Sequence, residues 1–266
     1  MALRPTRPLV RGHHTMRSLP ACLLRAYTTE STPTPSSFTV HEQLQPQSQP
    51  QSYSQSESQS PPRWSQTPAG MKAPFQLDHA RSPHNKIWSV NNNPGRLDDM
   101  YNRFIGPGGS KMLPEELKWL AVTHKSFDQG RRGFNDKLAL MGRLTLIMEA
   151  TKEIVSKAPL KGSRQTDDLS RTPFEHEQLA AVDNLNVENP KDVVGKEKLF
   201  QFANQIGLTD VVRWKPRLPG NLEASGLEVV LNSAVMAIVG AITLQHGSVV
   251  AATIVRERIL ARLPKD

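Results

Sequence analysis

Cysteine is almost absent from this sequence. The 266 residues include one cysteine, Cys22, which lies in an N-terminal segment that we expect to be removed. A chain without cysteine cannot form a disulfide, bind zinc through thiolates or attack a substrate with a thiol. These kinds of chemistry are therefore excluded for the mature chain.

Apolar residues are also scarce, at 37% of the composition, and the mean hydropathy is −0.47. These values are low for a chain that folds along its whole length, so we expect part of it to be disordered. No run of apolar residues approaches the ~20 that a membrane span requires. We therefore expect no membrane span.

Acidic residues are missing from the N-terminus, where the first one is Glu30. Residues 1–27 are rich in arginine and in hydroxyl side chains, which is typical of a mitochondrial transit peptide, with processing expected near Thr28. The alternative is a basic arm that binds nucleic acid. The five arginines of this segment supply +5 of the formal net charge of +8, which leaves +3 for residues 30–266.

Composition divides the rest of the chain into three parts. Residues 28–70 are rich in Ser, Gln and Pro, and we expect a disordered linker because such a segment buries too little apolar area to offset its ordering entropy. Residues 71–94 are expected to form an extended arm, in which Trp88 is available for docking. Residues 95–266 are expected to form one helical domain, interrupted by a polar insertion at 158–195.

Apolar periodicity within this domain is helical. Between residues 95 and 105, apolar side chains recur at i, i+3, i+4, i+7 and i+8, which is one stripe of a helix. A second helix is expected after Pro114, and Asn135 is expected to cap a long helix that runs to about residue 157. Three more helices are expected at 196–208, 225–247 and 248–263. The predicted fold class is all-α.

Two motifs lie in these predicted helices. The first is AVTHKS (121–126) followed by NDKLALMGRLTL (135–146), and the second is SAVMAIVGAITLQHG (233–247). In order, helical placement and the Gly-Ala pair, they resemble the two signature motifs of the ribonuclease III domain family. The resemblance covers about residues 95–263 and implies the helical fold of the ribonuclease III endonuclease domain.

The family's enzymes hold Mg²⁺ with four carboxylates, two from each motif helix, and the metal activates water against a phosphodiester. The resemblance places Ala139 and Arg143 at the acidic positions of the first motif, and Ser233 and Met236 at those of the second. These groups are poor ligands for a hard cation, and the fixed charge of Arg143 repels it. The resemblance therefore implies a degenerate site without metal, cofactor or catalysis.

Other polar residues of these helices are not expected to replace the lost acids. Asp136, Glu149 and Glu228 are expected to be solvated surface acids rather than ligands of a rebuilt site. His124 and Ser126 are expected on one helix, where a separation of two residues keeps their side chains apart. They are therefore not expected to act as a base and its nucleophile.

Two glycines lie within the motif helices. Gly142 and Gly240 each cost about 1 kcal/mol in a helix relative to alanine. We expect a close crossing of the two helices as the compensation. The resemblance also implies that domains of this family pair through residues 120–147, and the expected interface residues are His124, Ser126, Leu138 and Met141.

Basic side chains are the candidates for RNA binding, although an ordinary solvated surface is the alternative at so low a net charge. The strongest candidate is the segment 213–217, where an aromatic residue alternates with basic ones. The residues expected to contact RNA are Lys125, Arg131, Arg132, Lys137, Lys161, Arg164, Arg213, Trp214, Lys215, Arg217, Arg256 and Arg258.

Taken together, these features resemble the fungal mitochondrial large-ribosomal-subunit proteins of the ribonuclease III-like family. The resemblance implies a non-catalytic scaffold in the mitochondrial matrix that binds ribosomal RNA and neighbouring ribosomal proteins, as a heterodimer with another ribonuclease III-like subunit. One alternative is an RNA-processing factor that pairs with an active ribonuclease subunit. Another is a pseudoenzyme regulator that binds RNA transiently.

Overall fold

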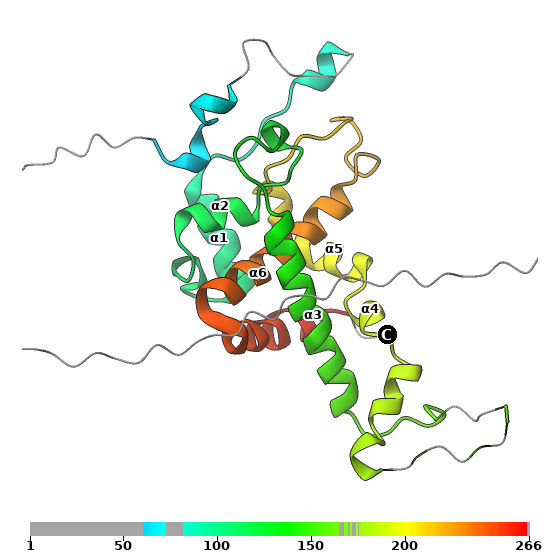
Figure 1. Cartoon of the computed structure of the whole chain (residues 1–266). Helices are drawn as coiled ribbons and strands as arrows, with labels where there is room; N and C mark the ends of the chain where they lie inside the picture. Colours follow the sequence, from blue (N-terminus) through cyan, green and yellow to red (C-terminus); the bar gives the residue numbers. More distant parts are fainter. Residues whose placement is uncertain are drawn as a thin grey trace, which may run out of the picture. The chain divides into compact units, whose positions relative to one another are not determined.

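Helices form the regular structure of the part of the chain that the computed structural model describes, which comprises residues 61–72, 82–164, 168–169, 171, 174 and 176–264 (Figure 1). For these residues the predicted all-α class is confirmed. The predicted transit peptide, the linker up to residue 60 and Cys22 lie outside the described residues.

The α-helices of the described ranges are α1 (Pro94–Ile105), α2 (Glu115–Ala121), α3 (Asp136–Ser156), α4 (Pro190–Val193), α5 (Lys196–Gln205) and α6 (Leu227–Ile254). Short 3₁₀ turns lie before and between them: η1 (Arg63–Ser65), η2 (Ala69–Met71), η3 (Pro83–Lys86), η4 (Gly109–Lys111), η5 (Phe127–Gly130), η6 (Glu177–Leu179), η7 (Val182–Asn186) and η8 (Leu208–Asp210). From α6 the chain continues into a π-helical segment, η9 (Val255–Leu260).

Helix α1 forms where the apolar stripe predicts it. All five apolar residues of the stripe are buried: Leu97, Met100, Tyr101, Phe104 and Ile105. The Asn93 side chain accepts a hydrogen bond from the backbone N–H of Gly95, which caps the first turn. Pro94 occupies the first helical position, where its missing N–H costs nothing.

Helix α2 ends earlier than the sequence predicts. It stops at Ala121, because the chain then forms an isolated parallel bridge between Thr123 and Arg213. The N–H of Arg213 donates to the carbonyl of Val122, and the N–H of His124 donates to the carbonyl of Arg213, both at 2.9 Å. A long-range pairing that the local pattern does not contain therefore ends the helix.

The residue before α3 does not act as the predicted cap. Asn135 is fully buried, and its side chain makes no capping hydrogen bond. Its amide instead donates to the carbonyl of Ala121 at 3.0 Å, and its backbone N–H donates to the carbonyl of Thr123 at 3.0 Å. Asn135 therefore fixes the chain between α2 and α3.

Helix α6 lies in the core and is apolar on all sides. The helical stretch Leu227–Leu260 is long and apolar enough to cross a membrane, so the expectation that no such run exists was wrong. However, 67% of its most apolar window is buried inside the protein. Helices α2, α3 and α5 pack around it, and an all-apolar helix is what a core position requires. Gly247, with φ 84° and ψ 171°, interrupts the helix.

The predicted insertion at 158–195 is more ordered than a plain loop, because its described part contains η6, η7 and α4. Its base is held by Asn184, which is fully buried. The Asn184 amide donates to the carbonyls of Ile154, Lys157 and Ala158 at 3.2–3.4 Å, and its side-chain oxygen accepts from the N–H of Leu160 at 2.8 Å. One buried amide thus binds a carbonyl in the last turn of α3 and backbone groups of the residues that follow the helix.

Candidate functional site

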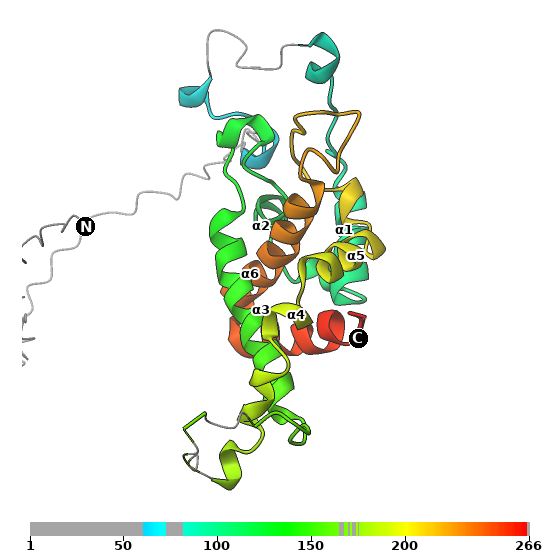
Figure 2. The same ribbon diagram turned by 90° about the vertical axis from the view of Figure 1, so that its right-hand side faces the viewer.

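Helices α3 and α6 cross with their backbones in contact, as the motif glycines predict (Figures 1 and 2). A Cβ atom added at Gly142 would lie 1.8 Å from the carbonyl oxygen of Met236, and one at Gly240 would lie 2.0 Å from a carbonyl oxygen of α3. Further along, the hydroxyl oxygens of Thr145 and Thr243 lie 3.4 Å apart. The close crossing is confirmed, and it brings the two motifs together.

The four positions that the resemblance assigns to metal-binding acids flank this crossing. Ala139, Ser233 and Met236 are half-buried, and Arg143 is exposed. Within the described ranges, no group of three or more His, Cys, Asp or Glu side chains is placed to hold a metal ion. The crossing therefore offers one cation, one hydroxyl and apolar groups, a set that does not fit Mg²⁺.

Asp136 and Glu149, the two acids of α3 near the crossing, differ in exposure. Asp136 is exposed and its carboxylate lies 3.6 Å from the Lys125 ammonium. The expectation that Glu149 is solvated is wrong, since its side chain is only 3% exposed. One carboxylate oxygen accepts from Lys152 at 2.7 Å, and the other lies 3.5 Å from Nε of Arg256. Segment η9 covers this carboxylate, a long-range contact that helical spacing does not predict.

The expectation that His124 and Ser126 lie apart on one helix is also wrong. Because α2 ends at Ala121, both residues lie in a turn, where His124 Nδ1 is 3.0 Å from Ser126 Oγ. The same nitrogen accepts from the backbone N–H of Ser126 at 3.2 Å, and Ser126 Oγ accepts from the N–H of Lys215 at 3.0 Å. Burial and the nearby Lys125 charge lower the pKa of His124. His124 and Ser126 therefore link the turn after α2 to the loop that contains Lys215.

The predicted RNA-contact residues fall into three groups by exposure. The residues with exposed side chains are Lys125, Lys137, Lys161, Arg164, Arg217 and Arg256. Those half-buried are Arg131, Arg132, Lys215 and Arg258. Arg213 and Trp214 are buried, at 1% and 3% exposure. The structure therefore contradicts the prediction that the segment 213–217 presents its aromatic residue to RNA.

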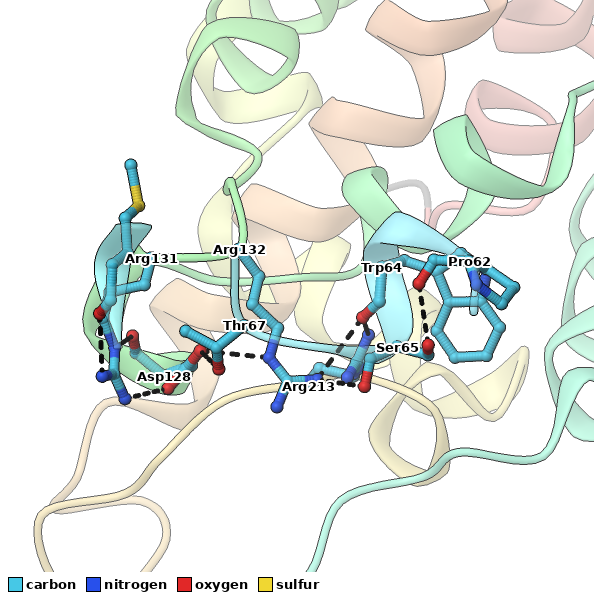
Figure 3. Close-up of polar contacts among 9 residues, drawn as sticks. Pro62, Trp64, Ser65, Thr67, Asp128, Arg131, Arg132 and Arg213 are labelled. Carbon is cyan, nitrogen blue, oxygen red and sulfur yellow. Dashed lines mark hydrogen bonds and ion pairs between the residues drawn. The ribbon is translucent and has the colours of Figure 1, made fainter. Parts of the chain in front are cut away.

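Arg213 is a core residue with a charge (Figure 3). Its guanidinium lies over the rings of Phe127 and Trp119, at 4.4 and 5.2 Å from their centroids, and its Nη1 donates to the carbonyl of Trp64 at 3.1 Å. Burial, followed by the charge of Arg132, lowers the pKa of Arg213 to about 10. Aromatic faces and a carbonyl thus replace part of the water that this cation loses, while its buried Nε and Nη2 have no hydrogen-bond partner among the described residues.

The group that covers Arg213 comes from a segment predicted to be disordered. We call residues 61–72 the strap; they contain η1 and η2, so the predicted linker does not extend to residue 70. The Trp64 ring stacks on Trp119 with centroids 4.4 Å apart and an interplanar angle of 19°. A single tryptophan in a Ser/Gln/Pro-rich stretch was the only sequence signal for this docking.

Asp128 connects the strap to the turn that leads into α3 (Figure 3). Its carboxylate accepts from the Thr67 hydroxyl at 2.7 Å and from Arg132 Nε at 3.0 Å, and it also pairs with Arg131. Arg132 in turn donates to the carbonyl of Ser65 at 2.8 Å. Burial alone would raise the pKa of Asp128, but these hydrogen bonds outweigh it and the pKa is lowered. Arg131 and Arg132 are therefore occupied with the strap.

The residues expected at a dimer interface are only partly available. Leu138 is buried against the core, and His124 and Ser126 are tied into their turn, whereas Met141 is 37% exposed. Three apolar side chains that are more exposed than Met141 lie on the same helix and were not predicted: Leu140 at 62%, Leu144 at 63% and Met148 at 57%. Their i, i+4, i+8 spacing was visible in the sequence.

Comparisons with known proteins agree with the motifs. The profile of the family described as ribonuclease-III-like matches residues 114–263. A large ribosomal subunit protein, mL57, of Neurospora crassa is 50% identical over 203 residues, which is 76% of this chain and 76% of that protein.

Two solved structures of the nuclease domain of ribonuclease III from Campylobacter jejuni are also similar. Each is 20% identical with a TM-score of 0.43; one match covers 66% of this chain and 99% of that domain, and the other covers 65% and 100%. The family profile spans more than half of the chain, and the fungal relative shares half of its aligned residues. The chain belongs to the ribonuclease-III-like family.

Proposed function

We propose that this protein is a structural constituent of the mitochondrial large ribosomal subunit, in which a ribonuclease III-like domain serves as a non-catalytic scaffold. The observation that carries the proposal is the state of the α3–α6 crossing. Its backbone contact at Gly142 and Gly240 is kept, while no carboxylate stands at the four flanking positions. The 50% identity to a large ribosomal subunit protein supports the ribosomal role.

The absence of catalysis follows from the chemistry of the crossing. Two-metal hydrolysis of a phosphodiester needs several anionic oxygens that hold the ions against the substrate. Arg143, at one of the four flanking positions, adds a positive charge that opposes the binding of a cation. The purified protein is expected not to cleave double-stranded RNA with Mg²⁺ or Mn²⁺. Cleavage that disappears on mutation of Asp136 or Glu149 would refute this part of the proposal.

The mitochondrial location rests on the N-terminal composition. Five arginines and no acid precede Glu30, which suits import into the matrix. N-terminal sequencing of the protein isolated from mitochondria is expected to give a start near Thr28. Retention of Met1 in that protein would contradict the import argument.

RNA contact is assigned to the exposed cations rather than to the buried segment around Arg213. Lys125 and Lys137 lie near the start of α3, and Lys161 and Arg164 open the insertion. With a net charge of only +3 for residues 30–266, phosphate contacts alone would be lost as salt rises, because each contact releases counterions. Protein–protein burial must therefore supply much of the binding energy.

The exposed side chains of α3 are suited to that burial. Leu140, Leu144 and Met148 are each more than half exposed on one face of the helix, and a contiguous apolar face of this kind usually marks an interface. We assign this face to a heterodimer with another ribonuclease III-like subunit. The asymmetry of a ribosome, which holds single copies of its proteins, favours a different partner over a second copy.

Sedimentation tests the ribosomal assignment. In sucrose gradients of mitochondrial lysate, the protein is expected to move with the large subunit at low salt and to stay there at moderately raised salt. Complete release into light fractions, or an amount far below that of the subunit, would favour the alternative of a transient RNA-processing factor.

A further inference from the structure

Two hollows lie where the second half of α3 meets the insertion and η9. Their volumes are about 460 and 370 Å³, within the roughly 300–1,000 Å³ that ligand sites in proteins occupy. Glu153 and Leu260 line both hollows, so the two adjoin, and we call them together the insertion groove. Helix α4 of the insertion and segment η9, which supply its other walls, both pack against α3 (Figure 1).

Apolar side chains form part of this groove. Leu260 and Leu263 are each 5% exposed and belong to the core, whereas Val187 is 56% exposed at the wall that the insertion supplies. Val193 is half-buried in the same wall. The groove therefore offers apolar contacts to a side chain that enters it.

The charged residues of the groove are mostly paired with one another. The carboxylates are those of Glu149, Glu153, Glu188 and Asp192, and the cations are those of Lys152, Lys157, Lys198 and Arg256. Lys152 and Arg256 both lie against Glu149. Lys157 pairs with Glu188 at 2.6 Å, and Lys198 also has a partner. Within the described ranges, the carboxylates of Glu153 and Asp192 have none, so the groove holds two unmatched negative charges.

The buried carboxylate of Glu149 is also incompletely bonded. Its side chain is 3% exposed, and its Oε2 accepts no hydrogen bond from the described residues, since Nε of Arg256 lies 3.5 Å away. A buried oxygen without a donor costs free energy. Because the Arg256 side chain is 59% exposed and can change rotamer, an N–H group that enters the groove can reach this oxygen.

The insertion differs in charge from the rest of the chain. Residues 176–195 contain Glu177, Asp183, Glu188 and Asp192 against Lys191 alone, a net charge of −3. Since residues 30–266 together carry +3, the remainder of that range carries +6. This part of the insertion is therefore an acidic segment on a basic protein.

These charges distinguish among possible occupants. RNA would bring phosphates against the unmatched carboxylates of Glu153 and Asp192, which repel them. A second copy of the chain that paired through the same groove would set one acidic segment against the other, because a two-fold interface uses one patch on both subunits. A basic segment of a different protein meets neither obstacle.

We propose that the insertion groove binds an extended segment of a neighbouring protein in which arginine or lysine alternates with apolar residues. Its cations pair with Glu153 and Asp192, and its apolar side chains cover Val187. The inference rests on the proposed function, because proteins that assemble on RNA carry basic segments that phosphates attract. It adds a protein partner that binds away from the exposed leucines of α3.

A synthetic peptide can replace the unidentified partner in a binding test. The probe is a fluorescein-labelled peptide in which Arg and Lys alternate with Val, and fluorescence anisotropy measures its binding to the full chain at physiological salt. The double variant E153K/D192K is expected to weaken binding about ten-fold or more, because two attractions become repulsions. A peptide with Ser in place of Val is expected to bind the wild type about five-fold more weakly, because it lacks the apolar side chains.

Two further variants separate the groove from general charge. The matched control D99K/E223K reverses two exposed acids outside the groove and changes the net charge equally. It is expected to weaken binding less than about two-fold, because salt screens exposed charges. Val187→Gln changes no charge and is expected to weaken binding about three-fold through lost apolar contact. Circular dichroism is expected to show unchanged helix content in all variants.

Four results would overturn the proposal. Equal weakening in E153K/D192K and in the control would reduce the binding to general charge. Equal binding of the serine and valine peptides would show that the apolar wall is not used. Wild-type binding to an RNA hairpin that Val187→Gln abolishes would assign the groove to RNA. A wild-type dimer that E153K/D192K dissociates in sedimentation velocity would assign it to a second copy. None of these depends on the gradient profile, so the ribosomal proposal can stand or fail separately.

Discussion

The two sides of α3 are under opposite constraints. On the inner side, Gly142 touches the backbone of α6 and leaves no room for even one methyl group. On the outer side, Leu140, Leu144 and Met148 are each more than half exposed. The inner side shows what the fold requires, and the outer side is the surface that we propose for assembly.

The two α3 positions that the resemblance assigns to metal-binding acids lie between these sides. Ala139 is half-buried next to the crossing, and Arg143 is exposed beside Leu144. Once a chain no longer needs Mg²⁺, such positions are free to take up packing or partner selection. The residues around such a position therefore indicate its present role, in addition to the ligands that the position lacks.

The largest expected effect is on the inner side. Gly142→Ala places a Cβ 1.8 Å from the Met236 carbonyl oxygen, so the two helices must separate. We expect a loss of about 3 kcal/mol or more in the free energy of unfolding, because the clash is with backbone and overpacking is already costly against side chains. Urea denaturation measures it. Gly220→Ala is the control, since nothing lies within 4 Å of its Cβ, and an equal loss there would contradict the account.

A second substitution measures how much the stacking of the strap's Trp64 on Trp119 contributes to the stability of the fold. Trp64→Ala removes the ring that stacks on Trp119 at 4.4 Å. We expect a loss of about 1–3 kcal/mol in stability, from lost burial and stacking, and faster proteolysis within the strap, residues 61–72. Arg63→Ala, an exposed neighbour, is expected to change neither. Unchanged proteolysis of the Trp64 variant would mean that the hydrogen bonds of the strap with Asp128, Arg132 and Arg213 hold it without the ring.

A smaller effect is expected from pH. The pKa of His124 is lowered in the folded state below its ordinary value of 6.5, so the unfolded chain binds the proton more readily. The contribution of His124 to stability is therefore complete above pH 6.5 and is lost as pH falls through the folded pKa. Thermal melts between pH 7.5 and 5.5 are expected to show a decline that His124→Asn reduces. An identical decline in the variant would refute the assignment.

The smallest effect on folding is expected on the outer side. Leu144→Asp replaces a side chain that is 63% exposed, and its unfolding free energy should change by no more than about 0.5 kcal/mol. The same variant is expected to lose incorporation into the large subunit when it is expressed in mitochondria. A variant that is stable and still fully incorporated would show that this face has no partner.

Much of the fold could be predicted from local patterns. The stripe of α1, the glycines of the crossing and the motif helices are short-range signals, and the structure agrees with them. The errors share one cause, which is contact between residues far apart in the chain. Arg213 is buried because Trp64 reaches it from 149 positions away, and α2 ends early because Thr123 pairs with Arg213.

The candidate site shows the same division. The assignment of Ala139, Arg143, Ser233 and Met236 to the family's acidic positions uses only local signals, because each motif lies within one helix, and it stays a prediction. The burial of Glu149 was not readable, because Arg256 approaches it from η9. Exposure of Leu140 and Leu144 could not be inferred either, since an apolar residue in a core helix is normally buried.

Copy number is the most direct test of the central claim that this domain is a structural part of the ribosome. Quantitative mass spectrometry of purified mitochondrial large subunits is expected to find the protein in equal molar amount to the other subunit proteins, one copy per particle. A small fraction of a copy per particle, with most of the protein elsewhere in the matrix, would contradict the account.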